Sequence, residues 1–173
     1  WNEACAGMEF ALNFMKNNVK IYSPALLSSQ FLLITLAYYG HKRGYSLKSE
    51  ESKRLRHWIL DANAKGRYSR GSSETLDQDH ATLREGGGAQ ELIDRLRQQV
   101  GRLQIEAEEL EGRNRRSALF MTMCLAFRAG GAKDWRSTLA IALDHSGSEH
   151  KLQFHHVFPK AVLRKANHTA REA

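Results

Sequence analysis

Two adjacent histidines near the C-terminal end are the residues of this chain whose types and spacing best suit chemistry. His155 and His156 follow Leu152-Gln153-Phe154 and precede Val157-Phe158-Pro159-Lys160. Apolar residues on both sides, closed by a proline, predict a short strand that ends in a turn. One imidazole there can bind a metal ion while the other accepts a proton from water. A nuclease that uses one metal ion needs this division of roles.

The two rings reach one site only if the strand is distorted. Neighbouring side chains of a regular strand point to opposite faces, so His155 and His156 cannot both enter the same apolar layer. A twist or bulge at the end of the strand can aim both rings at one pocket. A histidine with a pKa near ~6.5 is largely neutral at physiological pH and can deprotonate the attacking water. The alternative is that both histidines are structural and hydrogen-bonded to backbone groups.

The run His155-His156-Val157-Phe158-Pro159-Lys160, followed by Ala161-Val162-Leu163, resembles the His-His-Ile-Phe-Pro-Lys stretch that opens the HNH (ββα-metal) nuclease motif in restriction proteins of the GmrSD type. The helical region before it, with Gly66-Arg67-Tyr68-Ser69 and Asp134-Trp135, is similar to the region that precedes this motif in those proteins. The resemblance extends over most of the chain, but only the histidine stretch bears on chemistry. It implies that His155 is a metal ligand and His156 the general base.

The resemblance also implies a role for the parent protein. We expect a cytoplasmic, metal-dependent DNA endonuclease of a modification-dependent restriction system, a form of phage defence, with a nucleotide-hydrolysing domain or subunit upstream. The family pattern continues with an asparagine and a further ligand on a helix, and the chain reaches Ala173 before either. We therefore expect an incomplete ligand set here and poor DNA cleavage by this fragment alone.

The expected cofactor is a divalent metal, with Mg²⁺ or Mn²⁺ preferred and Zn²⁺ as the alternative. One imidazole cannot hold Mg²⁺ in place of its hydration water, and this ion also favours oxygen donors. Zinc accepts histidine but needs three or four protein ligands, and neither Cys5 nor Cys124 has a finger-like spacing to the strand. We assign the nearby histidines to the surface; they are His145, His150 and His168.

The charge pattern favours a polyanionic partner. The net charge is +7, and basic residues exceed acidic ones by six in residues 41–70 and by four in residues 151–173. Residues 71–111 have the opposite balance, with six more acidic than basic residues. Positive charge therefore collects beside the histidines, where Lys160, Arg164 and Lys165 would hold DNA by its phosphates. The alternative is an ordinary basic surface.

A second candidate phosphate site precedes a predicted helix. Residues 66–73 combine turn formers with an aromatic ring and two arginines, Arg67 and Arg70. Arginine side chains and backbone N–H groups at a helix start bind phosphate well. The competing interpretation is a solvated loop that only caps the helix.

Apolar periodicity predicts a mainly α-helical domain over residues 1–145. The resemblance implies that the incomplete nuclease motif packs on this domain over residues 146–173. That motif would contribute a short strand or hairpin. The expected helices cover residues 1–17, a second helix from Ser23 with Pro24 in its first turn to a stop at Gly40, a third from Ser49 through Ile59, and then residues 74–83, 92–110, 118–127 and 134–143. The 92–110 pattern favours an amphipathic helix over a coiled coil.

Two further features limit the function classes. No apolar run reaches the ~18 residues of a membrane-spanning helix. Cys5 and Cys124 each lie in apolar helical surroundings, which predicts two buried thiols and a reducing compartment. Besides the nuclease, two classes stay open: a non-catalytic helical module that binds DNA or a partner subunit, and a helical scaffold without a nucleic-acid role. The scaffold predicts surplus charge that is scattered in space.

Overall fold

The computed structural model describes residues 1–69, 72–111, 113, 117–134, 138 and 165. Within these ranges the chain is mainly α-helical and contains no β-strand, so the predicted mainly-α class is confirmed. The strand predicted around His155 and His156 lies outside the described residues, as does most of the helix predicted over residues 134–143. The division at residue 146 lies outside them too.

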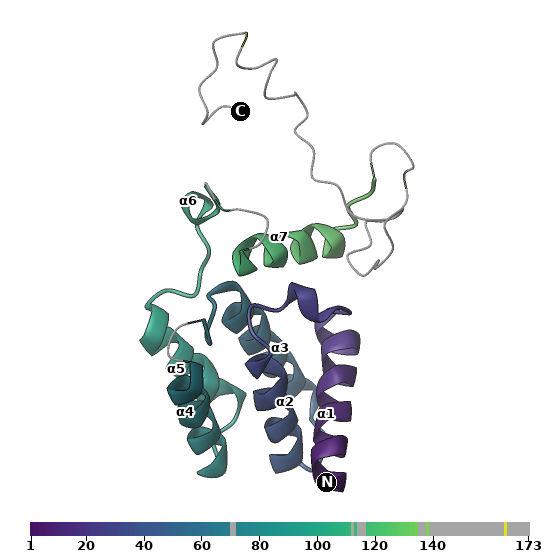
Figure 1. Ribbon diagram of the computed structural model, residues 1–173, viewed down its shortest axis with the longest axis vertical. Helices are drawn as coiled ribbons and strands as arrows, with labels where there is room; N and C mark the ends of the chain where they lie inside the picture. The colour runs from purple at the N-terminus through teal and green to yellow at the C-terminus, as the bar shows by residue number, and fades with distance from the viewer. Residues whose placement is uncertain (70–71, 112, 114–116, 135–137, 139–164, 166–173) are drawn as a thin grey trace.

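Helices of similar direction form the body of the molecule, and a further helix lies across one end of them (Figure 1). Helix α1 packs on α2, α2 on α4, and α3 on both α5 and α7. None of the described helices is both long and apolar enough to cross a membrane. The elements are α1 (Asn2–Phe14), the π-helix η1 (Met15–Val19), the 3-10 helix η2 (Pro24–Leu26), α2 (Phe31–Lys42), α3 (Ser49–Ala64), α4 (Ser72–Arg84), α5 (Ala89–Val100), α6 (Ala107–Leu110) and α7 (Ala118–Ala129).

Helix α3 forms the centre of the core. Its apolar side chains recur at steps of three and four, and Leu55, Trp58 and Ile59 are completely buried. This spacing places them on one face, which packs into the same core as Leu32 and Leu36 of α2. The helix predicted from Ser49 is confirmed, and its opposite face displays charged residues to solvent.

Helix α2 begins later than the sequence predicts. Pro24 starts only one 3-10 turn, and the α-helix begins at Phe31. Asn63 of α3 explains the difference, because its side chain accepts the Ser28 N–H at 2.7 Å and donates to the Leu26 carbonyl at 3.1 Å. These two bonds satisfy backbone groups that a continuous helix would have paired internally.

Gly40 does not end α2 as predicted, since the helix continues to Lys42. A Cβ atom at position 40 would overlap the Phe10 ring of α1. Gly40 therefore allows two helices to approach closely.

A glycine does divide the predicted helix at 92–110. Helix α5 ends at Val100, and Gly101 follows with φ of 77°, a left-handed conformation that favours glycine. The short helix α6 begins only at Ala107. The two cysteines also differ: Cys124 is buried as predicted, whereas the prediction of a buried thiol at Cys5 is wrong, because Cys5 is exposed.

Candidate nucleic-acid interface

A hollow of about 450 Å³ opens where the end of η1 and the faces of α3 and α7 meet. Val19 and Leu125, 4% and 7% exposed, and the half-buried Leu60 give it an apolar floor. Asn63 holds two of its walls together, since its Nδ2 donates to Thr122 Oγ1 of α7 at 3.2 Å. The volume lies within the ~300–1,000 Å³ typical of small-ligand sites.

Three basic residues from three separate segments line this hollow: Lys20, Arg56 and Arg128. No aspartate or glutamate is among the described residues that line it. Lys20 and Arg56 are exposed, and neither forms an ion pair with another residue of the described chain. The site is therefore positively charged, which favours an anionic ligand.

An aromatic ring completes this surface. Tyr22 is 39% exposed, and the Arg128 guanidinium lies over its ring with Cζ 4.8 Å from the ring centroid. Aromatic rings and arginine planes both stack with nucleic-acid bases. The backbone brings Lys20 to the same rim, because η1 ends there in a left-handed residue with φ of 64° whose N–H donates to the Met15 carbonyl.

The hollow lies at the C-terminal end of α7. Ala126, Arg128 and Ala129 line it, and the chain leaves the helix at Gly130. The segment with His155 and His156 follows in sequence, and both histidines lie outside the described residues. The predicted DNA contacts Arg70, Lys160 and Arg164 also lie outside the described residues. Lys165 is described, and its side chain is exposed.

Arg67 has a structural environment in place of the expected phosphate contact. Its side chain is 2% exposed, and it pairs with the fully buried Asp79 of α4. Its Nη1 also donates to Gln99 Oε1 of α5 at 2.7 Å. A phosphate would have to displace these partners, so the structure does not support the DNA-binding role predicted for Arg67.

The neighbouring Tyr68 extends this buried network. Its hydroxyl donates to Asp79 Oδ2 at 2.6 Å and lies 2.7 Å from Thr35 Oγ1 of α2. Burial, together with the Asp79 charge, raises the pKa of Tyr68 well above its usual range. The phenol therefore stays protonated and serves as a donor that links α2 to α4.

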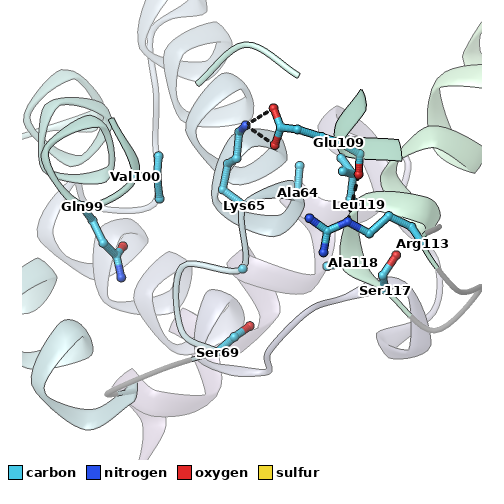
Figure 2. Close-up of a pocket in the computed structure, with 11 residues that line it drawn as sticks. Ala64, Lys65, Ser69, Gln99, Val100, Glu109, Arg113, Ser117, Ala118 and Leu119 are labelled. Atoms are coloured by element: carbon cyan, nitrogen blue, oxygen red, sulfur yellow. Dashed lines mark hydrogen bonds and ion pairs between the residues drawn. The ribbon is translucent and has the colours of Figure 1, made fainter. Parts of the chain in front are cut away.

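A second hollow, also about 450 Å³, lies beside Gly66 and Ser69 (Figure 2). Its basic groups are already engaged: Lys65 Nζ lies 2.9 and 3.0 Å from the two Glu109 carboxylate oxygens, and Arg113 Nε donates to the Glu109 carbonyl at 2.8 Å. The described lining of this hollow contains two cations and one carboxylate, and both cations are bound to Glu109. It is a weaker candidate for a phosphate than the hollow at Tyr22.

A third hollow, of about 560 Å³, contains the only described histidine that pairs with a carboxylate. His57 Nε2 lies 2.9 Å from Asp61 Oδ2, and burial raises the pKa of Asp61. Arg97 and Arg102 also line it, but they pair with Asp94 and Glu106. The described part of the chain holds no group of three or more His, Cys, Asp or Glu residues arranged to bind a metal.

The basic surplus predicted in residues 41–70 is only partly available to a ligand. Intramolecular ion pairs engage four of its basic side chains: Arg43 with Glu51, Lys53 with Glu50, Lys65 with Glu109, and Arg67 with Asp79. Arg56 is the residue of this segment that lines the hollow at Tyr22.

Sequence reasoning missed Lys20, Tyr22 and Arg128 as candidate site residues. Arg128 lies more than a hundred positions after Lys20 and Tyr22, and no local motif connects it to them. The one available signal was that Lys20 and Tyr22 belong to a non-periodic connection between two apolar helices, where exposed functional side chains commonly occur.

Comparisons with protein-family models, curated proteins and solved structures found no match to this chain.

Proposed function

We propose that this chain is part of a metal-dependent HNH DNA endonuclease of a restriction system. In this proposal the helical body binds DNA, and the segment with His155 and His156 hydrolyses a phosphodiester. The observation that supports DNA binding is the meeting of Lys20, Arg56 and Arg128 at one hollow whose described lining includes no carboxylate. The support for hydrolysis is the resemblance of residues 155–160 to the opening of the nuclease motif.

The position of the hollow connects the two halves of the proposal. Because α7 ends at its edge, the chain passes a cationic surface before it reaches the histidines. DNA held there by its phosphates would contact the end of α7, and the histidine segment follows this helix in sequence. Lys160, Arg164 and Lys165 would add contacts to the backbone, which position the duplex without selecting sequence.

The proposed chemistry assigns one role to each histidine. His156 accepts the proton of the attacking water, and His155 is a ligand of the divalent metal, which when bound stabilises the developing charge on the phosphate. One imidazole is not a sufficient ligand set, and the described residues offer no group of three donors. The metal assignment therefore rests on the resemblance of residues 155–160.

The test compares cutting with binding in the intact protein. His156→Ala should abolish Mg²⁺- or Mn²⁺-dependent cleavage of duplex DNA and leave DNA affinity unchanged, because a base acts on water and not on the phosphate backbone. His150→Ala serves as the matched control, since it removes a nearby imidazole outside the motif. Retention of cleavage by His156→Ala would refute the base assignment.

The second candidate is a non-catalytic helical module that binds DNA. The hollow at Tyr22 favours it over a scaffold, because this site lies entirely in the helical body and needs neither histidine. Under this alternative the intact protein would bind duplex DNA but show no metal-dependent cleavage.

A further inference from the structure

We infer that the hollow at Tyr22 binds a single unpaired nucleotide, with the base in the hollow and its phosphate on the basic rim. This inference rests on the proposed DNA-binding function and specifies which part of the DNA enters this site. It is carried by three features that occur together: an apolar floor, an exposed aromatic ring, and two exposed cations, Lys20 and Arg56, that form no ion pair within the described chain.

The floor distinguishes a base from a duplex backbone. Phosphates along an intact duplex need cations and water, and they would leave uncovered the apolar surface of the half-buried Leu60 and of the exposed Ala126 and Ala129. The flat face of a base is apolar enough to cover this surface. A concave site of this volume therefore suits a ligand that has both a flat ring and a negative charge.

The ring of Tyr22 supplies the stacking surface. A large aromatic side chain exposed at the edge of a hollow is a site on which a base can stack, and the Arg128 guanidinium beside it adds a second planar, cationic surface. Stacking on such groups tolerates any base, so we expect affinity for an unpaired nucleotide without strong sequence preference.

The rim supplies the charge for the phosphate. Lys20 and Arg56 come from the end of η1 and from α3, and both line the hollow beside its apolar floor. A nucleotide with its base on the floor places its phosphate toward solvent, where these two side chains can pair with it. An acidic peptide would satisfy the cations but would leave the aromatic ring without a flat partner.

The experiment measures binding of the full chain to two labelled probes by fluorescence anisotropy without added metal. One probe is a short perfect duplex, and the other is the same duplex with one unpaired fluorescent adenine analogue. We expect the second probe to bind roughly tenfold more tightly and the analogue emission to be quenched, as stacking on an aromatic ring predicts.

Two variants test the site without removing core residues. Tyr22→Ala removes the stacking ring, and Ala126→Trp fills the hollow from an exposed position of α7. Both should abolish the preference for the unpaired nucleotide, so that each variant binds the two probes with equal affinity. Phe127→Ala is the matched control, because Phe127 is 56% exposed on the same helix but does not line the hollow.

The outcomes separate this inference from the proposed function. Equal affinity for both probes would overturn the inference and leave duplex binding intact. A preference that survives in both Tyr22→Ala and Ala126→Trp would place the unpaired nucleotide elsewhere and also overturn it. Absence of binding to either probe would overturn the inference together with the proposed DNA binding.

Discussion

Arg67 and Asp79 form a buried ion pair in which two guanidinium nitrogens face two carboxylate oxygens. Arg67 Nε lies 3.0 Å from Asp79 Oδ2, and Nη2 lies 2.5 Å from Oδ1. The pair connects the turn after α3 to α4. The hydrogen bond from Arg67 to Gln99 connects the same turn to α5. A paired geometry of this kind compensates the cost of removing both charges from water.

Removal of one partner should therefore be strongly destabilising. Asp79→Ala leaves the Arg67 charge buried without its carboxylate, and we expect the free energy of unfolding to fall by about 3–5 kcal/mol. Urea denaturation followed by circular dichroism measures this change. Glu50→Ala is the control, because its pair with Lys53 is exposed and should contribute almost nothing. Equal losses in both variants would contradict the structural role of the buried pair.

The structural role of Arg67 could not be predicted from the sequence. Its neighbours are turn formers, so the local sequence allows either a phosphate site or a structural anchor. The decision depends on Asp79, twelve positions away, and on Gln99, which are brought together only by the packed fold. Local patterns carry no information about such partners.

Among the helices, too, features set by local sequence were predictable, and features set by distant residues were not. The third helix was predictable because the spacing of Leu55, Trp58 and Ile59 is a local periodic signal. The start of α2 was not, because it depends on hydrogen bonds from Asn63 to backbone groups more than thirty positions earlier. The candidate site likewise depends on distant residues, since Tyr22 and Arg128 meet only in the fold.

The contact between Gly40 and Phe10 makes a prediction about core packing. In Gly40→Ala the new methyl group overlaps the Phe10 ring, so we expect a loss of about 1–3 kcal/mol in the free energy of unfolding. The double variant Gly40→Ala, Phe10→Leu should recover part of this loss, because the smaller side chain gives the methyl group room. Such a coupling between adjacent positions is measured by a double-mutant cycle.

Gly130→Ala is the control for this prediction. A Cβ at position 130 meets only two carbonyl oxygens at 3.5 Å, which is ordinary contact. We expect little change in stability from it. Simple additivity of Gly40→Ala and Phe10→Leu would show that the two positions are not in direct conflict.

The Glu51 carboxylate predicts a dependence of stability on pH. Burial opposes its ionisation, but hydrogen bonds from Tyr39 and Arg43 outweigh burial and lower the pKa of Glu51. A carboxylate with a lowered pKa in the folded state stabilises the protein above its ordinary pKa of about 4.3, and this contribution is lost as the pH falls through the folded value.

We therefore expect Glu51→Gln to reduce stability at neutral pH and to make little difference in acid, where Glu51 itself is protonated. The measurement is the free energy of unfolding in urea at a series of pH values below neutrality. Glu91 also has a lowered pKa, due to its bond with the Gly88 N–H, so Glu91→Gln gives an independent comparison. A loss in Glu51→Gln that is the same at every pH would contradict the assignment.

The cations of the hollow at Tyr22 predict a specific change in the salt dependence of DNA binding. Each phosphate contact releases counterions, so the slope of log K against log salt concentration is about −0.9 per contact on duplex DNA. Arg56→Ala and Lys20→Asn should each weaken duplex binding and reduce the magnitude of this negative slope by about 0.9. Asparagine is chosen at position 20 because it tolerates the left-handed backbone there.

Arg54→Ala is the matched control, because Arg54 is exposed on the same helix as Arg56 but does not line the hollow. It should leave the slope unchanged. The double variant Arg56→Ala, Lys20→Asn should reduce the magnitude of the slope by more than either single variant, since the two side chains come from separate segments of the chain. An unchanged slope in the double variant, or an equal change in Arg54→Ala, would show that DNA does not bind through this hollow.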